Sequence, residues 1–468
     1  MTAAICRLLV RRGHRVTPFK GQNMALNAYV TAEGGEIGHA QAVQAWAAKI
    51  EPQVAMNPIL LKPQGDMTSQ VILMGQSAGR VGAAEYYEKF FDRGWQAITS
   101  SLDQLQKNYD YIVCEGAGSP AEINLKHRDL TNMRVASYLQ AKTLLVADID
   151  RGGVFAHIVG TLELLEPAER ALIKGFVINK FRGQRSLLES GLDWLTERTG
   201  IPVLGVMPYF QSQLPAEDSL DLFDRRINKP DAELQIAVIR LPRMANFTDF
   251  DPLMAEASVQ VSYLDRPSQQ KFDAIILPGS KTTISDCLWL QSTGLAEWIK
   301  AQATSGTTIL GICGGLQMLG HKISDPDQLE GEISEVTGLG LLPVETVMLD
   351  RKILRQRQVD SKYFSFDSPV KGYEIHQGQS NWVANNMPQT LFDDPDLGWV
   401  WQDQIWATYL HGLFDNGAWR RSWLNRLRVV KNLPPLPIKI PDYALQRDAN
   451  LDTVADLVGE HLNLQPLL

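Results

Sequence analysis

Short apolar runs alternate with helix-like stretches through the first half of the chain. The strand-like runs are RVTPFK, YDYIVCEGAG, TLLVADIDRGG, GFVINKFRG and PVLGVMPYF. Strands that alternate with helices in this order predict an α/β fold with a parallel, doubly wound sheet. The runs lead into Gly, Asp, Asn or Lys residues, and open α/β sheets bind ligands at the carboxyl ends of their strands. We therefore expect the functional side chains of this half at those strand ends.

The second half repeats the α/β pattern after a break. Between residues 224 and 234, DRRINKPDAEL, the apolar pattern gives way to charged and turn-forming residues. A new series of apolar runs follows: QIAVIRLP, FDAIILPGSK, TTILGICGGLQMLG and IWATYLHGLFD. A Pro-rich link then leads to the helical pattern of YALQRDANLDTVADLVGEHL. The sequence therefore predicts two doubly wound α/β domains, over residues 1–230 and 235–425, and a helical tail over residues 426–468.

The composition is that of an ordinary globular protein. Of the 468 residues, 44% are hydrophobic and 21% are charged, which is enough apolar material for two or more cores. The formal net charge of -8 argues against nucleic acid as a main partner. No apolar run is long enough to span a bilayer, and the first residues lack a signal-peptide pattern. The four cysteines lie far apart without metal-ligand spacing, so we expect a cytoplasmic protein that binds no membrane.

Cys313 lies in the strongest chemical motif of the sequence. The segment GICGGLQ places this cysteine between a buried strand and a helix, with glycines on both sides. Glycines allow a tight turn, and the amino end of a helix lowers the pKa of a thiol and offers N–H groups to an oxyanion. We therefore expect Cys313 to attack an amide, and the remaining cysteines to be core residues.

A cysteine nucleophile needs a base, and two histidines are candidates. His411, in YLHGLF, follows another predicted strand, whereas His376, in GYEIH, lies in a Gly-rich stretch that could instead line the substrate region. We favour His411 and keep His376 as the rival.

Together these elements resemble class I glutaminase domains, over about residues 235 to 420. The resemblance implies that Cys313 forms a γ-glutamyl thioester, that His411 moves the protons and that ammonia leaves. It also implies that Gly279, in PGSK, and Gly314 supply the oxyanion N–H groups. Most such domains carry a glutamate where this chain has Leu413, so the usual third triad member is missing. That absence, with GYEIH, is typical of the subgroup that amidates cobyrinic acids.

The first half resembles the dethiobiotin-synthetase-like P-loop family, and PFKGQNMALNAYVTAEGGEIGHAQAVQAWAA is similar to a stretch distinctive of the cobyric acid synthase family. The resemblance implies ATP and Mg²⁺ as cosubstrate and ion. It places Lys20 on phosphate oxygens, Glu115 on Mg²⁺ and Asn179 on adenine. Asp148 and Asp150 are weaker candidates. A further group could touch either the corrin substrate or the nucleotide: Asn23, Asn27 and Glu36.

The family resemblance implies that glutamine, ATP and adenosylcobyrinic acid a,c-diamide enter, and that the b, d, e and g carboxylates become amides. One alternative is cobyrinic acid a,c-diamide synthase, with the same chemistry at two other carboxylates, although FKGQNMALN argues against it. A P-loop-like regulatory scaffold without catalysis is the alternative from another class. The cysteine elbow argues against that scaffold.

The amino terminus departs from the family pattern. The chain opens with TAAICRLLVRRGHRV, which resembles the helix that follows a Walker A loop, and GxxxxGK[ST] occurs nowhere in the sequence. A missing central strand would leave unpaired sheet edges. We therefore expect Met1 to be a start placed too late, with a truncated chain as the alternative and synthetase activity then in doubt.

Overall fold

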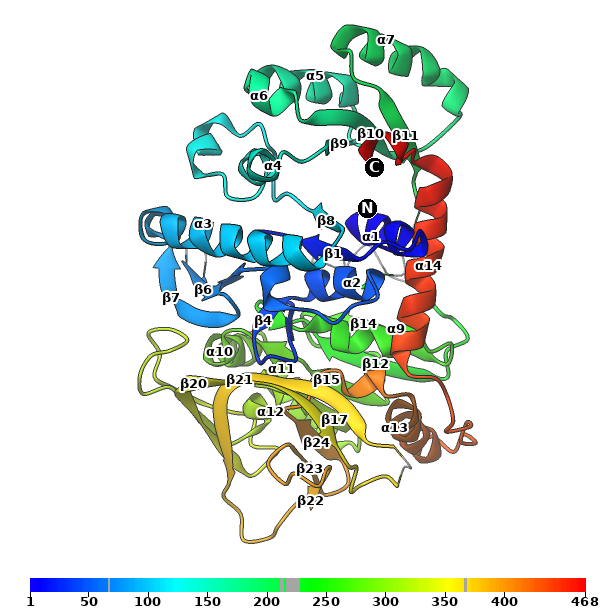
Figure 1. Cartoon of the computed structure of the whole chain (residues 1–468). Helices are drawn as coiled ribbons and strands as arrows, with labels where there is room; N and C mark the ends of the chain where they lie inside the picture. The colour runs from blue at the N-terminus through cyan, green and yellow to red at the C-terminus, as the bar shows by residue number, and fades with distance from the viewer. Residues whose placement is uncertain (66–67, 211–213, 216–227, 366–367) are drawn as a thin grey trace.

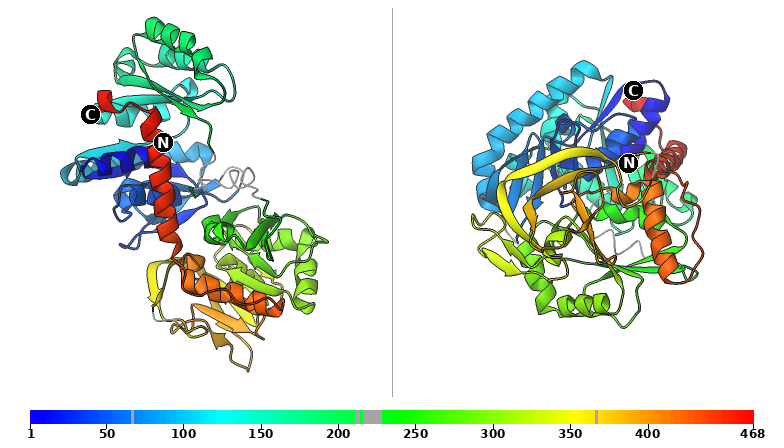
Figure 2. Two further views of the ribbon diagram at one scale, coloured as in Figure 1. Left: turned by 90° about the vertical axis from the view of Figure 1, so that its right-hand side faces the viewer. Right: turned by 90° about the horizontal axis from the view of Figure 1, so that it is seen from below.

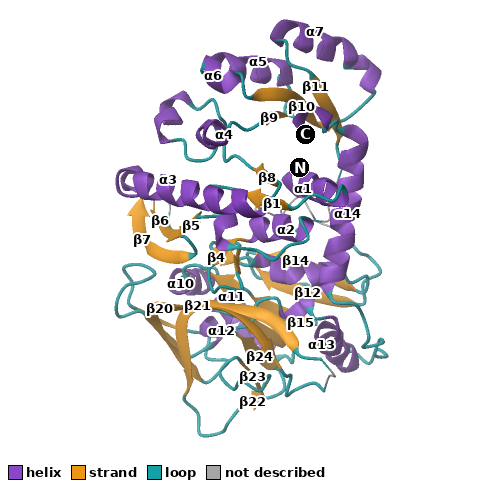
Figure 3. Cartoon of the chain, in the orientation of Figure 1, coloured by secondary structure: helices purple, strands orange, loops and turns teal. Residues whose placement is uncertain are grey.

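The computed structural model describes residues 1–65, 68–210, 214–215, 228–365 and 368–468. Two α/β bodies lie one above the other, and a long carboxyl-terminal helix runs along their side (Figure 1, Figure 2). Figure 3 shows helices covering the sheets of both bodies. Part of the predicted boundary at 224–234, residues 224–227, lies outside the described residues. Within the described residues, no helix is both long and apolar enough to cross a membrane.

The first half contains two separate parallel sheets. One pairs β1 (Val16–Phe19) with β8 (Tyr111–Cys114), and the other has the order β11-β10-β9. The strands of the second sheet are β9 (Thr143–Asp148), β10 (Ile173–Phe181) and β11 (Val203–Pro208). Among the described residues β8 therefore pairs only with β1, and β9 only with β10. Val146 in β9 is 42% exposed although strands of a doubly wound sheet are normally buried.

A mixed layer of the first half, in which only β2 and β5 are parallel, faces the second half. Its sheet has the order β2-β5-β6-β7, beside a hairpin of β3 and β4. The strands are β2 (Gln22–Met24), β3 (Ala28–Val30), β4 (Glu36–Gly38), β5 (Ile59–Pro63), β6 (Thr68–Leu73) and β7 (Gln76–Gly82). The helices of the first half are α1 (Thr2–Arg11), α2 (His39–Ala47), α3 (Ala83–Asn108), α4 (Met133–Leu139), α5 (Val154–Leu164), α6 (Pro167–Arg170) and α7 (Glu189–Thr199).

A seven-stranded sheet forms the core of the second half, in the order β14-β12-β15-β17-β24-β23-β22. Its parallel strands are β12 (Leu234–Ile239), β14 (Val259–Leu264), β15 (Ala274–Leu277), β17 (Thr308–Ile312) and β24 (Ile405–Thr408), followed by antiparallel β23 (Gly398–Trp401) and β22 (Gln389–Thr390). Helices α9 (Asp251–Ala255), α10 (Thr283–Ser292), α11 (Leu295–Thr304), α12 (Gly314–Leu319) and α13 (Gly417–Val430) belong to this body. The middle strands are apolar on both faces because the sheet is buried on both.

A long antiparallel hairpin brings the second half against the first. Strand β20 (Val344–Val359) pairs with β21 (Val370–Trp382) in a sheet that also contains β18 (Lys322–Ser324) and β19 (Glu335–Thr337). The backbone N–H of Ala28 donates to Asn246 Oδ1 at 3.2 Å, and Thr248 Oγ1 donates to Asn27 Oδ1 at 3.3 Å. These bonds join the start of β3, and the residue just before it, to the glutaminase-like body.

The carboxyl-terminal helix α14 (Tyr443–His461) packs on α1 and reaches β11. The guanidinium of Arg7 pairs with Asp448 at 2.7 Å and Asp452 at 2.9 Å. The tail thus belongs to the packing of the first half. Residue 426, where the sequence placed the start of the tail, lies inside helix α13.

Candidate active site

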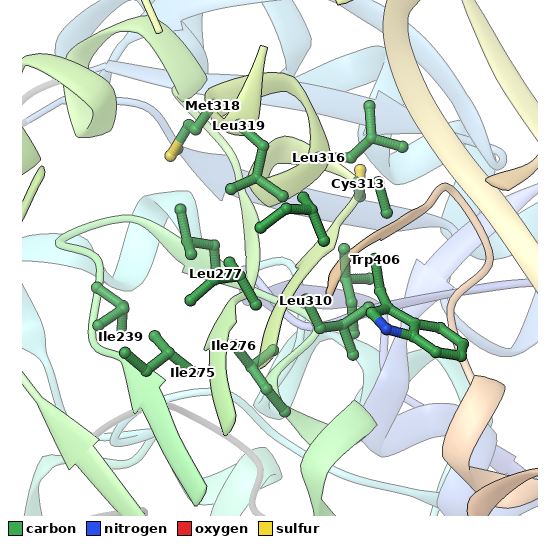
Figure 4. Close-up of a cluster of buried hydrophobic side chains, with 14 of the residues drawn as sticks. Ile239, Ile275, Ile276, Leu277, Leu310, Cys313, Leu316, Met318, Leu319 and Trp406 are labelled. Atoms are coloured by element: carbon green, nitrogen blue, oxygen red, sulfur yellow. The ribbon is translucent and has the colours of Figure 1, made fainter. Parts of the chain in front are cut away.

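Cys313 lies at the turn between strand β17 and helix α12 (Figure 4). Its φ of 52° and ψ of -107° are unusual for a residue with a side chain, and such strain is common at functional turns. A Cβ on Gly315 would lie 2.0 Å from the carbonyl oxygen of Leu277, and one on Gly311 would lie 2.7 Å from Leu316 N. The glycines therefore let the helix pack directly on the sheet and hold the thiol at the sheet edge.

His411 follows strand β24, which lies beside β17 in the sheet. Its backbone exchanges hydrogen bonds with Tyr373, and the two rings stack at 5.5 Å. The imidazole and Cys313 line one pocket, and the sulfur interacts electrostatically with the ring. The two side chains predicted to form the nucleophile and base therefore lie together.

Asp249 is a third member of this constellation that the sequence reading missed. Its Oδ2 accepts a hydrogen bond from His411 Nδ1 at 2.7 Å, and its Oδ1 accepts one from the N–H of Gly412 at 2.8 Å. The carboxylate lies in the turn Phe247–Phe250, far upstream of the histidine. Leu413 occupies the position of the usual glutamate, as the sequence indicated. The carboxylate that contacts His411 comes instead from a segment far away in the sequence.

The charge of His411 follows from these neighbours. Burial disfavours the imidazolium, but the Asp249 carboxylate and the Cys313 sulfur outweigh it and raise the pKa of His411 to about 10. The ring is therefore protonated at neutral pH. An adjacent imidazolium stabilises a thiolate, which is the reactive form of cysteine.

The predicted oxyanion residues lie beside this pair. A Cβ on Gly279 would lie 3.3 Å from His411 Cε1, and one on Gly314 would lie 2.8 Å from Ser280 N. Gly314 is the first residue of α12, where backbone N–H groups have no acceptor within the helix. The loop at residues 279–280 and the helix start are thus in close contact, and larger side chains would separate them.

His376, the rival base, is engaged elsewhere. Its Nδ1 lies 2.8 Å from the carbonyl oxygen of Gly378 and its Nε2 lies 3.2 Å from Glu374 Oε2. The ring also stacks on Tyr409 with centroids 3.9 Å apart. Each ring nitrogen thus already lies within hydrogen-bond distance of a protein oxygen. His376 therefore has no free nitrogen with which to take a proton from Cys313.

Gln317 is a further pocket residue that the sequence reading did not single out. Its Nε2 donates to Tyr409 Oη at 3.3 Å, whereas its buried Oε1 has no hydrogen-bond partner among the described residues. An acceptor left in this way normally has a ligand or water as its partner. The sequence signal that could have found Gln317 is its spacing: it follows Cys313 by four residues, which places it about one helical turn further along.

Lys20 and Glu115 form the second predicted cluster, at the ends of β1 and β8. Lys20 Nζ donates to Glu115 Oε1 at 2.7 Å, and Gln44 Nε2 donates to Glu115 Oε2 at 2.5 Å. Burial raises the pKa of Glu115, but Lys20 and Gln44 together hold it below its usual value. A carboxylate that stays ionised fits one protein ligand of Mg²⁺, which otherwise keeps waters and phosphate oxygens. Among the described residues, no group of three or more His, Cys, Asp or Glu side chains could hold a metal ion.

Asn179 lies apart from Lys20 and Glu115, in the other parallel sheet of the first half. It is paired in register with Asp148 near the carboxyl end of β10. Asp148 bonds Lys180 at 2.9 Å, and Asp150 bonds Arg182 at 3.0 Å. The predicted nucleotide-site residues therefore lie in two separate sheets, that of β1 and β8 and that of β9 and β10, whose strands Figure 1 labels.

Both halves match known protein families. Residues 1–220 match the CobQ/CobB/MinD/ParA nucleotide binding domain, and residues 235–419 match the CobB/CobQ-like glutamine amidotransferase domain. The chain is 64% identical to the cobyric acid synthase of Acaryochloris marina (strain MBIC 11017), over 100% of this chain and 96% of that relative. Identity is 62% to the cobyric acid synthase of Nostoc sp. (strain PCC 7120) and 61% to that of Synechocystis sp. (strain ATCC 27184), over 100% of this chain and 96% and 95% of those relatives. The chain therefore belongs to the cobyric acid synthase family of glutamine amidotransferases.

Proposed function

We propose that this enzyme uses ATP and glutamine to amidate the b, d, e and g carboxylates of adenosylcobyrinic acid a,c-diamide, giving adenosylcobyric acid. The observation that carries the proposal is the buried chain from Cys313 to His411 to Asp249 in a family member that also has a nucleotide-binding half.

The glutaminase step uses the Cys313 thiolate and the His411 imidazolium. The thiolate attacks the amide carbon of glutamine, and the backbone N–H groups at Gly279 and Gly314 stabilise the negative oxygen. His411 gives its proton to the leaving nitrogen, so that ammonia departs and a γ-glutamyl thioester remains. Water then attacks the thioester, His411 takes up a proton, and glutamate leaves as the thiolate is restored. Asp249 keeps the ring oriented and charged through Nδ1.

The synthetase half must activate the acceptor carboxylate before ammonia attacks it, because an unmodified carboxylate oxygen is a poor leaving group. ATP with Mg²⁺ supplies a phosphoryl group for this activation. We assign Lys20 to phosphate oxygens, Glu115 to Mg²⁺ and Asn179 to adenine. The ionised Lys20–Glu115 pair supports the first two assignments.

Two further assignments complete the proposal. Residues 1–230 provide ATP-dependent activation, residues 235–425 provide ammonia, and residues 426–468 fasten the carboxyl terminus to the first half.

The free cysteines Cys6, Cys114, Cys287 and Cys313 support a cytoplasmic location, where thiols stay reduced.

Product masses test the proposal. The enzyme is incubated with the corrinoid diamide, ATP and Mg²⁺, and with either glutamine or an ammonium salt. We expect four replacements of a carboxyl OH by NH₂ from either nitrogen source, and Cys313→Ala to lose only the reaction with glutamine. A Cys313→Ala enzyme that still uses glutamine would contradict the assigned nucleophile. A product that carries no more than two new amide groups would contradict the assigned substrate.

A further inference from the structure

The pocket at Cys313 contains charged side chains that the hydrolysis of an amide does not by itself require. Besides Cys313 and His411, the pocket is lined by Lys62, Lys281, Lys352 and Glu330. Lys62 and Lys281 are buried, and the side chain of Lys352 is only 11% exposed. Burying ammonium groups costs free energy unless each finds an anionic partner.

Two of the three lysines share one carboxylate from the first half. Lys62 Nζ donates to Glu36 Oε1 at 2.7 Å, and Lys352 Nζ donates to Glu36 Oε2. Glu36 is fully buried, and these two ammonium groups outweigh its burial and lower its pKa to about 2. Glu36 is therefore ionised and committed to Lys62 and Lys352.

Lys281 is the third lysine of the pocket, and it does not share Glu36. Its ammonium makes no hydrogen bond or ion pair with the part of the chain that the structure describes, although the residue is only 7% exposed. Glu330 is the remaining carboxylate of the pocket, and it accepts hydrogen bonds from Thr283 Oγ1 and from the N–H of Ile284, each at 3.2 Å. The three lysines thus face two carboxylates, which leaves one ammonium group without a carboxylate of its own when all five are ionised.

The backbone of Lys281 is fixed next to the loop that carries Gly279. The N–H of Lys281 donates to the carbonyl oxygen of Arg243 at 3.0 Å. On either side of it, Ser280 Oγ donates to Asp286 at 2.6 Å and accepts from the N–H of Thr282 at 3.1 Å. Lys281 is therefore held beside the loop of Gly279, in the pocket that Cys313 also lines. Burial and the ammonium groups of Lys352 and Lys62 lower the pKa of Lys281, so a bound anion would restore its charge.

We propose that Lys281 binds the α-carboxylate of glutamine and makes the enzyme specific for the amino acid over simple carboxamides. The proposal rests on the glutaminase function proposed above. Glutamine carries its amide at one end and a carboxylate and an ammonium at the other, which matches a pocket that holds Cys313 together with Lys281 and Glu330. The α-ammonium of the substrate pairs with Glu330. Lys281 is thus a specificity residue that leaves the reacting amide to Cys313 and His411.

A comparison of two substrates tests this role. 4-Aminobutanamide is glutamine without its α-carboxylate, and ammonia release is measured from both compounds. A charge-assisted hydrogen bond contributes enough that Lys281→Met should lower kcat/KM for glutamine about 10- to 100-fold, mainly through KM. The same substitution should leave kcat/KM for 4-aminobutanamide unchanged. Lys281→Arg should restore part of the glutamine activity, and Lys300→Met, on the exposed side of α11, should change neither substrate.

Equal losses with both substrates would overturn the proposal, because they would indicate a structural or catalytic role for Lys281. No loss with glutamine would overturn it as well. The failure of the glutaminase function itself gives a different result, namely a folded wild-type enzyme that releases no ammonia from glutamine. In that case, calorimetric titration of glutamine still tests the role of Lys281. The proposal requires that glutamine binds to Cys313→Ala and that it binds at least tenfold more weakly to the double variant with Lys281→Met.

Discussion

The hydroxyl of Tyr373 donates a hydrogen bond to the carbonyl oxygen of Ala28 at 3.2 Å, across the contact between the two halves of the chain. The same hydroxyl accepts a hydrogen bond from Asn246 Nδ2 at 3.1 Å, and the ring stacks on the catalytic candidate His411. One side chain thus touches the synthetase half, the pocket wall and the base. The glutaminase site is therefore built partly on the other half.

Tyr373→Phe should weaken this contact and slow glutamine hydrolysis. It leaves the buried Asn246 donor and the Ala28 carbonyl without this partner, which should cost about 1–3 kcal/mol of unfolding free energy. Thermal unfolding and initial rates of glutamate release measure the two effects. Tyr138→Phe, which removes an exposed hydroxyl bonded to Asp103, is the control and should change neither. Unchanged stability in Tyr373→Phe would mean that water replaces the hydroxyl.

Asp249→Asn should lower glutaminase activity while leaving the Cys313 pocket intact. An amide at this position cannot hold the His411 imidazolium by charge, so proton transfer to the leaving nitrogen loses its orienting partner. We expect kcat to fall by at least about tenfold. Asp265→Asn, an exposed carboxylate of the same half, should leave the rate unchanged. Activity equal to the wild type in Asp249→Asn would show that Asp249 is only a structural partner of His411.

The pH profile provides an independent check on Asp249. Asp249 and Cys313 raise the pKa of His411 to about 10, so the imidazolium persists until the pH rises through that value. The alkaline limb of kcat/KM for glutamine hydrolysis should therefore lie near pH 10. In Asp249→Asn that limb should move down toward the ordinary histidine pKa of about 6.5. An alkaline limb at the same pH in both enzymes would contradict the ion pair.

The sequence identified those parts of the site whose signals are local. Cys313 was found because its neighbouring glycines lie within one strand–turn–helix unit, where they let α12 pack closely on the sheet. Asp249 could not be found in this way, since its partnership with His411 joins segments far apart in the sequence. Its segment, ANFTDFDP, is indistinguishable from an ordinary turn. The charged residues of the pocket are likewise far apart in the sequence, because Glu36 and Lys62 come from the first half of the chain.

The fold shows the same division between local and distant information. Most parallel strands of both halves were predicted from their apolar runs, but β14 and the parallel pair of β2 and β5 were not. The β6–β7 hairpin was missed, although its turn at Met74 and Gly75 has positive φ at both residues, a common hairpin geometry. The docking of α14 on α1 depends on ion pairs between the two ends of the chain. Patterns within either segment could not reveal that docking.

Gly315→Ala should prevent the elbow from packing. The added Cβ would lie 2.0 Å from the carbonyl oxygen of Leu277, which is backbone and cannot turn away. We expect a loss of about 3 kcal/mol or more, or failure to fold. Gly331→Ala is the matched control, since a Cβ there meets nothing within 4 Å. Melting temperatures measure both, and a normal melting temperature for Gly315→Ala would show that α12 can shift away from β15.

Arg7→Met should loosen helix α14 without unfolding the glutaminase half. The Arg7 guanidinium is 1% exposed and bonds Asp448, Asp452 and the carbonyl oxygens of Trp46 and Ala47. Methionine keeps much of the apolar volume but leaves these acceptors without their donor, which should cost roughly 2 kcal/mol because the aspartates are partly exposed. Hydrogen exchange of the amides in 443–461 should then accelerate about 30-fold. Exchange in α12 should not change, and Arg12→Met, at an exposed position, should alter neither helix. Equal protection of α14 in Arg7→Met and the wild type would show that apolar contacts alone hold the helix.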